Sequence, residues 1–169
     1  MKMKKSHILI AVLIIVLLYI IYSAIPTESK TNPPPPQKNT KNAPPQGYTE
    51  YSKRLQWIWN DIDLALERAK SENKLVLVDF WAGWCGWCAK ADKEVFPTTR
   101  VEDVILKYYI PIKIDTDAYP QIQMKYEVRG LPTIVILDKD GKIKGTIVGF
   151  RKAEEFVTLL LQFVGGSHG

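Results

Sequence analysis

The residues best suited to chemistry are two cysteines, Cys85 and Cys88, the only ones in this 169-residue chain. They lie in the segment Trp84-Cys85-Gly86-Trp87-Cys88, directly after an apolar run and at the predicted start of a helix. The free N–H groups and positive dipole end of a helix start stabilise a thiolate and lower its pKa. We therefore expect Cys85 to be the nucleophile. Cys88, on the same side of the helix, would resolve the mixed disulfide.

Three other uses of the cysteine pair stay open. A purely structural disulfide over so short a loop would constrain the unfolded chain only modestly. A zinc site needs four ligands, and the only histidines are His7 and His168, near the two ends of the chain. Two buried apolar cysteines are the third alternative. We favour a redox disulfide, Cys85–Cys88, working without a metal or an organic cofactor.

The elements that must position these cysteines read as an α/β domain. Leu75–Phe80 is an apolar run rich in β-branched residues, which predicts a strand buried on both faces and hence a sheet covered by helices. Leu55–Trp59 fits a strand or the opening of a longer helix, and we favour a strand followed by a helix over Asp61–Ser71, capped by Asn60 or Asp61. Further helices are predicted at Cys85–Glu94, Val101–Tyr108, Tyr119–Tyr126 and Lys152–Val164, and strands at Ile110–Ile114, Thr133–Leu137 and Lys142–Val148. Asp140-Gly141 marks the hairpin between the last two strands.

The segment before this domain predicts a membrane anchor. Ile8–Ile25 is an uncharged apolar stretch of 18 residues, roughly 27 Å long as a helix. Lys2, Lys4 and Lys5 precede it, and the positive-inside bias keeps such a cluster in the cytoplasm. We therefore expect a single-pass protein of the cell membrane, with the cysteines on the extracytoplasmic side. A cleaved signal peptide is the alternative, with a small Ala24 but a bulky Tyr22 before the cleavage point.

Composition divides the chain into three parts: the basic tip and anchor at 1–25, a linker at 26–47 and a globular domain at 48–169. The linker holds seven of the eleven prolines and cannot build a core. The net charge of +5 belongs to the first 47 residues, which carry 6 basic residues and one acid, because residues 48–169 carry 17 of each sign. A domain without a clustered basic face is not expected to bind nucleic acid.

Several separated motifs carry a resemblance to a known family. Val78–Cys88, Gly130–Thr133, Asp140-Gly141 and Val148–Phe150 together resemble the thioredoxin superfamily over nearly all of Leu55–Phe163. The lead-in to the cysteines and the KADKEVF segment after them are most similar to membrane-associated thioredoxin-like domains, such as the C-terminal domain of the transmembrane thiol:disulfide interchange reductase. The resemblance implies a thioredoxin fold, with a central mixed β-sheet flanked by helices.

The resemblance also implies roles for four residues near the cysteines. Pro132 matches the family's cis-proline, which leaves the backbone of the preceding residue, Leu131, free to pair with an extended substrate. Thr133 follows as in the family. Asp79 matches the buried acid that exchanges a proton with the second cysteine, and a carboxyl in an apolar strand should have a raised pKa. A solvated or hydrogen-bonded strand Asp is the alternative for Asp79.

Two departures from thioredoxin itself limit these implications. Gly86-Trp87 stands where thioredoxin has Gly-Pro, so the redox potential cannot be carried over. The basic residue that thioredoxin places near the buried acid has no clear match, because Pro111 falls at that place and Lys113 is two residues off.

Aromatic and basic side chains surround the cysteines. Trp81 is expected in the core, whereas Trp84 and Trp87 form either an apolar landing surface for substrate or ordinary packing. Lys90 and Lys93 are expected on a solvated helix face.

These observations predict a thiol:disulfide oxidoreductase that reduces protein disulfides outside the membrane. Its partners would be protein disulfides or dithiols, including misoxidised proteins or the haem-attachment cysteines of apocytochromes, and a membrane reductase that donates electrons. A disulfide oxidase or isomerase is the second hypothesis, and a non-catalytic chaperone or assembly subunit is the third.

Overall fold

The computed structural model describes residues 14–18, which are helical, and residues 43–165. The chain divides into two units, residues 1–38 and 39–169, and the fold below is that of the second unit alone. The predicted anchor and linker lie mostly outside the described residues, so the domain bounds and the membrane segment stay predictions. Within residues 14–18 and 43–165, no helix is long and apolar enough to cross a bilayer.

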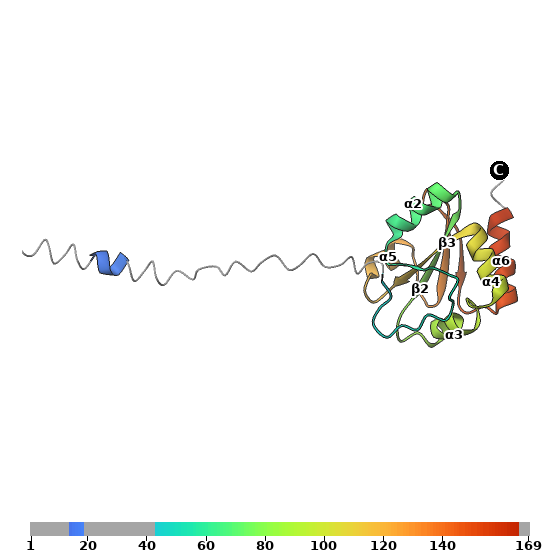
Figure 1. The fold of residues 1–169 in the computed structure, drawn as a ribbon, viewed down its shortest axis with the longest axis horizontal. Helices are drawn as coiled ribbons and strands as arrows, with labels where there is room; N and C mark the ends of the chain where they lie inside the picture. The colour runs from blue at the N-terminus through green and yellow to red at the C-terminus, as the bar shows by residue number, and fades with distance from the viewer. Residues whose placement is uncertain (1–13, 19–42, 166–169) are drawn as a thin grey trace, which may run out of the picture. The chain divides into compact units, whose positions relative to one another are not determined.

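A five-stranded mixed sheet forms the centre of the domain (Figure 1), as the sequence predicted. The strands lie in the order β1-β3-β2-β4-β5, where β1 is Ile58–Trp59, β2 is Leu75–Trp81, β3 is Tyr109–Asp115, β4 is Thr133–Leu137 and β5 is Ile143–Val148. β3 runs parallel to both β1 and β2, whereas β4 runs antiparallel to β2 and β5. The strand that leads to the cysteines is therefore the middle strand of the sheet.

Helices cover both faces of this sheet (Figure 1). Residues of α3 (Gly86–Glu94), α4 (Thr99–Tyr108) and α6 (Ala153–Gly165) join the core cluster on one face. α2 (Ile62–Glu72) and α5 (Pro120–Lys125) pack on the other face. Asp61 caps α2 by accepting the N–H of Leu64, as one of the two predicted caps. Each face thus has its own apolar core.

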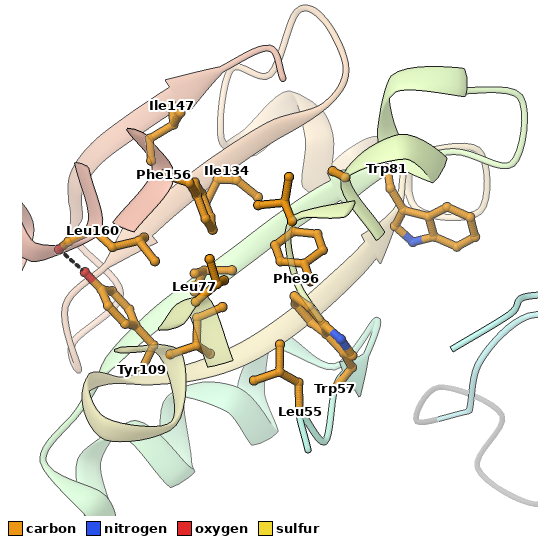
Figure 2. Packing of buried hydrophobic residues seen from close by; sticks show 14 of the residues in the cluster. Leu55, Trp57, Leu77, Trp81, Phe96, Tyr109, Ile134, Ile147, Phe156 and Leu160 are labelled. Carbon is orange, nitrogen blue, oxygen red and sulfur yellow. Dashed lines mark hydrogen bonds between the residues drawn. The ribbon is translucent and has the colours of Figure 1, made fainter. Parts of the chain in front are cut away.

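The alternation of side chains along β2 explains the two cores. Leu77 belongs to the cluster under α3, α4 and α6, and its neighbours Val76 and Val78 belong to the cluster under α2. Figure 2 shows the first cluster, in which the Tyr109 hydroxyl donates a 2.6 Å hydrogen bond to the Leu160 carbonyl and ties β3 to α6. Burial raises the pKa of Tyr109. The same alternation places Asp79, two residues after Leu77, on the face that α3, α4 and α6 cover.

The predicted strand at Leu55–Trp59 was too long. Only Ile58 and Trp59 pair with β3, and Asn60 then turns the chain toward α2 with a positive φ of 55°. Leu55 and Trp57 are nevertheless buried, and the Leu55 N–H bonds to the Ser52 hydroxyl instead of a strand. The apolar pattern there was a sign of burial rather than of sheet pairing.

Candidate active site

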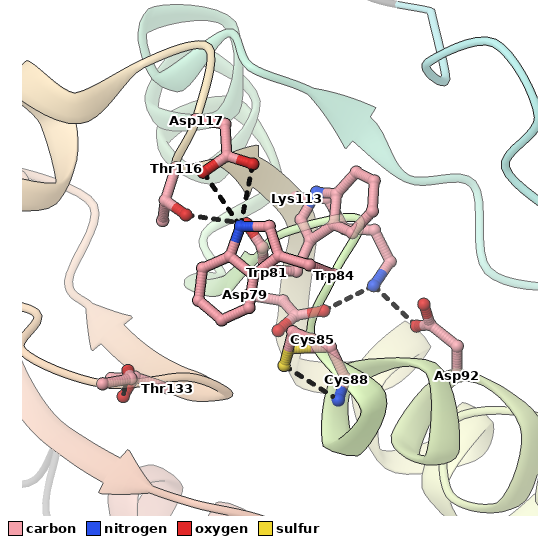
Figure 3. Close-up of a disulfide and its surroundings, with 11 residues drawn as sticks. Asp79, Trp81, Trp84, Cys85, Cys88, Asp92, Lys113, Thr116, Asp117 and Thr133 are labelled. Atoms are coloured by element: carbon pink, nitrogen blue, oxygen red, sulfur yellow. Dashed lines mark hydrogen bonds and ion pairs between the residues drawn. A yellow bond between two sulfur atoms is a disulfide. The ribbon is translucent and has the colours of Figure 1, made fainter.

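The two cysteines form a disulfide at the point where β2 gives way to α3 (Figure 3). Cys85 is the N-cap of α3, and its sulfur accepts the Cys88 N–H at 3.1 Å. Their exposed fractions are 6% and 3%. A thiolate on Cys85 would occupy the positive end of the helix, where free N–H groups stabilise it.

Leu131 and Pro132 lie beside a groove that also reaches residues 82–88, which join β2 to the first turn of α3 and are called the cysteine loop. The bond between them is cis, as the family resemblance implied. With Trp87, Gly149 and Phe150, they line a groove of about 310 Å³. The Pro132 carbonyl accepts the Gly149 N–H at 2.8 Å, so this part of the groove is held by the backbone.

Thr133 is not part of that lining. It is buried as the first residue of β4, and its hydroxyl donates to the Gly130 carbonyl at 2.7 Å. That bond fixes the loop that carries Leu131 and Pro132. The structure therefore places Thr133 as a support for the loop.

Trp84 and Trp87 stand out into solvent on the cysteine loop. Their exposed fractions are 71% and 57%, which is unusual for large aromatic side chains. The Trp84 indole donates to the Asp117 carboxylate at 3.0 Å (Figure 3), and the Trp87 ring lies 5.4 Å from that of Phe150. Trp81, as expected, is buried in the core.

A buried charge network lies beneath the disulfide and corrects the sequence interpretation of Lys113. The Lys113 ammonium contacts the Asp79 carboxylate and lies 2.7 Å from that of Asp92 (Figure 3). The parallel register of β2 and β3 pairs Asp79 with Lys113, so both side chains point to the same face. Lys113, rather than Pro111, therefore supplies the basic group beside the buried acid.

The side chains of this network are almost completely shielded from solvent. Lys113 is fully buried, and its ammonium lies 4.5 Å from the ring centre of Trp57 and 4.9 Å from that of Phe96. Burial raises the pKa of Asp79 even though Lys113 lowers it, and the nearby Asp92 raises it further. Burial lowers the pKa of Lys113, but the two carboxylates outweigh it and the net direction is upward. Asp79 is thus not solvated, but it does accept a hydrogen bond from the Lys113 ammonium, as the alternative interpretation of this residue allowed.

Asp92 and Tyr48 join the network without having been singled out as site residues from the sequence. The Tyr48 ring packs edge-on against Trp59 and Trp81, at 4.7 and 5.4 Å between ring centres. Burial raises the pKa of Tyr48, and the Asp92 carboxylate raises it further. The signal for Asp92 was available, because it follows Cys88 by one helical turn and so shares its face.

A second cleft, of about 500 Å³, also borders the cysteine loop. Residues 45–49 help to line it, together with Ala82, Gly83 and Ala89. Three carboxylates contribute to the lining, and they belong to Asp92, Asp115 and Asp117. In the described parts of the chain, no three His, Cys, Asp or Glu side chains are placed so that they could hold one metal ion together.

The sequence of this domain matches a known family and several known proteins. Residues 62–163 match the sequence model of a family described as a thioredoxin-like domain. The thiol:disulfide interchange protein DsbD of Pseudoalteromonas atlantica is 34% identical over 118 residues, which is 65% of this chain and 20% of that protein. The thioredoxin of Listeria monocytogenes is 34% identical over 102 residues, covering 60% of this chain and 94% of the relative.

A solved structure supports the same fold. The oxidised C-terminal domain of Neisseria meningitidis DsbD superposes with a TM-score of 0.53 at 24% identity, over 60% of this chain and 91% of that domain. The chain thus spans a small part of the Pseudoalteromonas atlantica protein and nearly all of the solved Neisseria meningitidis domain.

Proposed function

Because the chain belongs to the thioredoxin-like domain family, we propose that it is a thiol–disulfide oxidoreductase that reduces disulfides in proteins. The fold, the relatives and the joined cysteine pair support the oxidoreductase activity. The observation that carries the proposal is the Cys85–Cys88 disulfide at a helix N-terminus, above the buried Asp79.

The reaction we propose has two exchange steps. The Cys85 thiolate attacks one sulfur of a substrate disulfide, which forms a mixed disulfide and releases the other substrate sulfur as a thiolate that takes up a proton. The Cys88 thiol then loses its proton and attacks the Cys85 sulfur. This closes the Cys85–Cys88 disulfide and releases the second substrate thiol. Two electrons pass from the protein dithiol to the substrate, without a metal or an organic cofactor.

Asp79 is the proposed acceptor of the Cys88 proton. Its carboxyl is buried on the face of β2 that α3 covers, and its raised pKa favours holding a proton nearer neutral pH. Lys113 and Asp92 would set how readily that proton is taken and returned, because both act on the charge of Asp79. The groove of Leu131, Pro132 and Trp87 would seat the substrate backbone.

We further propose that the domain works outside the cytoplasm, held to the cell membrane by Ile8–Ile25. The support is the basic and then apolar sequence of the first 25 residues. Electrons would come from another dithiol protein, such as a membrane reductase, and pass to misoxidised proteins or apocytochrome cysteines. Protease added to spheroplasts that express the full chain should digest the domain. A protected domain would contradict this location.

The direction of exchange can be tested by the reduction potential of Cys85–Cys88 in the full-length protein. A potential near or below about −220 mV, measured against glutathione, is expected for a reductase. A value between about −120 and −180 mV would favour the second candidate, an oxidase or isomerase.

The exposed indoles of Trp84 and Trp87 favour the third candidate, a chaperone or assembly subunit. Cys85→Ser separates this candidate from the two enzymes. The variant should lose all disulfide exchange if the protein is an oxidoreductase. A chaperone would be supported if the wild-type protein catalysed no disulfide exchange and the variant still bound unfolded protein as strongly as the wild type.

A further inference from the structure

The two hollows that border the cysteine loop differ in charge. The groove of about 310 Å³ reaches the loop through Trp87, and the cleft of about 500 Å³ reaches it through Ala82 and Gly83. The linings of the two hollows share no residue. A substrate segment that crosses the disulfide would therefore meet two different surfaces.

Lys90 supplies positive charge on the groove side. Its ammonium lies 5.5 Å from the ring centre of Trp87 and 5.5 Å from that of Phe150, the two aromatic walls of the groove. Lys90 is exposed, as the sequence predicted, and its ammonium also lies over two rings that line the groove. Its carboxylate neighbour on the same helix, Glu94, is 3.8 Å away and exposed, and such surface pairs are weak.

Other charged groups near the groove do not reverse this sign. The Arg151 guanidinium donates to the Phe150 carbonyl at 2.8 Å and lies 3.0 Å from Glu155. Lys90 and Arg151 thus place two cations around Phe150, each with an exposed carboxylate four residues further along the chain as its neighbour. A carboxylate brought by a substrate would compete with those weak pairs.

The cleft has the opposite sign. Asp117 holds the Trp84 indole there, and Asp115 accepts the N–H groups of Asp117 and Ala118. Neither carboxylate has an ion pair among the described residues, whereas Asp92 is compensated by Lys113. An acidic substrate side chain would be repelled on this side, so the charge preference depends on position.

We propose that Lys90 is a specificity-determining residue, which selects substrate segments carrying an acidic side chain beside an apolar one next to the reactive cysteine. The apolar side chain would lie between Trp87, Leu131 and Phe150, and the acidic one would pair with Lys90 over the two rings. This inference rests on the proposed disulfide exchange and names the class of protein segment that it acts on.

The test uses the pre-reduced full-length protein and three disulfide-linked peptides of one apolar frame, with Glu, Gln or Lys beside the cysteine. The second-order rate constant of protein oxidation is measured at low salt for each peptide. The wild-type protein should react about three- to fivefold faster with the Glu peptide than with the Lys peptide, as expected for one exposed ion pair. The preference should shrink in high salt.

Lys90→Glu and Lys93→Glu form a matched pair of variants, because both make the same charge change on the exposed surface of α3. Lys90→Glu should abolish or reverse the ratio of the Glu to the Lys peptide, and Lys93→Glu should preserve it. The ratio is used because a new carboxylate near the helix start could slow the reaction of Cys85 with every peptide equally.

Equal rates for the three peptides, or equal loss of the ratio in both variants, would overturn the role of Lys90 and leave disulfide exchange standing. No reaction of the wild-type protein with any peptide would overturn the proposed function itself.

Discussion

At the scale of single residues, the buried lysine between two carboxylates has the largest consequences. Lys113 is in contact with Asp79 and Asp92, so the interior holds one positive charge against two acidic groups. An unbalanced buried charge is costly, and a carboxyl in this position is favoured in its protonated form. The raised pKa of Asp79 follows from this imbalance together with its burial.

Asp79→Asn is expected to stabilise the oxidised protein at pH 7. It leaves Lys113 and Asp92 as a balanced pair. The folded-state pKa of Asp79 lies above its ordinary 3.8, so its favourable contribution is complete below that value and is lost as pH rises through the folded pKa. The gain in unfolding free energy should therefore be small near pH 4 and grow toward pH 7, as measured by urea titration. Asp140→Asn, at an exposed carboxyl 4.0 Å from Lys70, is the control and should change little.

Lys113→Met is expected to destabilise the protein by about 3 to 5 kcal/mol at pH 7, because two buried carboxyls lose their cation. Without the cation the folded-state pKa of Asp79, which burial already raises, should rise further. The deficit should then be smallest at low pH and increase as pH rises. Urea unfolding at pH 5 and pH 7 measures it, and a deficit independent of pH would show that lost packing dominates.

At the scale of elements, the contact between β5 and α6 is close enough to depend on a glycine. A Cβ added to Gly145 would overlap the ring of Phe163. Gly145→Ala should therefore force the helix or the ring to move, at a cost of about 1 to 3 kcal/mol in unfolding free energy. Thermal or urea unfolding measures the cost.

Phe163→Ala in the same chain tests the cause. In its presence Gly145→Ala should cost little unfolding free energy. The double variant should then lose much less unfolding free energy than the sum of the losses of the two single variants. Additive costs would mean that Gly145 is needed for its backbone and not for the space that Phe163 occupies.

The same scale shows what the sequence could and could not predict. Thr133–Leu137 was predicted with its observed bounds, because a short run of β-branched residues ended at a turn signal on one side and followed Pro132 on the other. Local patterns likewise located the cysteines at the start of α3. Both features depend on residues that are neighbours in sequence.

The charge network depends on residues far apart in sequence and was only partly predicted. Asp79 was expected to be buried, but its pairing with Lys113 follows from the register of β2 and β3, which composition does not encode. Tyr48 was missed because it directly follows the proline-rich segment and has no periodic pattern around it. The exposure of Trp84 and Trp87 also required the structure, since aromatic residues are usually buried.

At the scale of the whole molecule, the segment 43–51 packs with the domain although its first five residues, 43–47, fall within the predicted linker. Tyr48 packs against Trp59 and Trp81, and residues 45–49 border the acidic cleft. Residues 45–47 of the predicted linker thus help to line this cleft.

A chain that begins at residue 43 should therefore unfold with the same free energy as the full chain. One that begins at Tyr51 should lose roughly 2 kcal/mol of unfolding free energy, because the half-buried Tyr48 ring and its contacts with Trp59 and Trp81 are gone. Tyr48→Ala in the full chain should reproduce most of the loss in urea titrations. Equal stability of the chains starting at 43 and 51 would mean that this segment only rests on the surface.

The position of β2 in the middle of the sheet also bears on how the chain matures during synthesis. The ribosome releases Cys85 and Cys88 before β3 and β4, the strands that flank β2 on its two sides. β2 is therefore synthesised well before β4, Thr133–Leu137, can pair with its second edge. Since the chain has no third cysteine, the thiols of an emerging chain have only each other as an intramolecular partner. Early oxidation of a nascent chain would give the native pairing, and a chain that stalls before residue 133 would expose an apolar strand edge to chaperones.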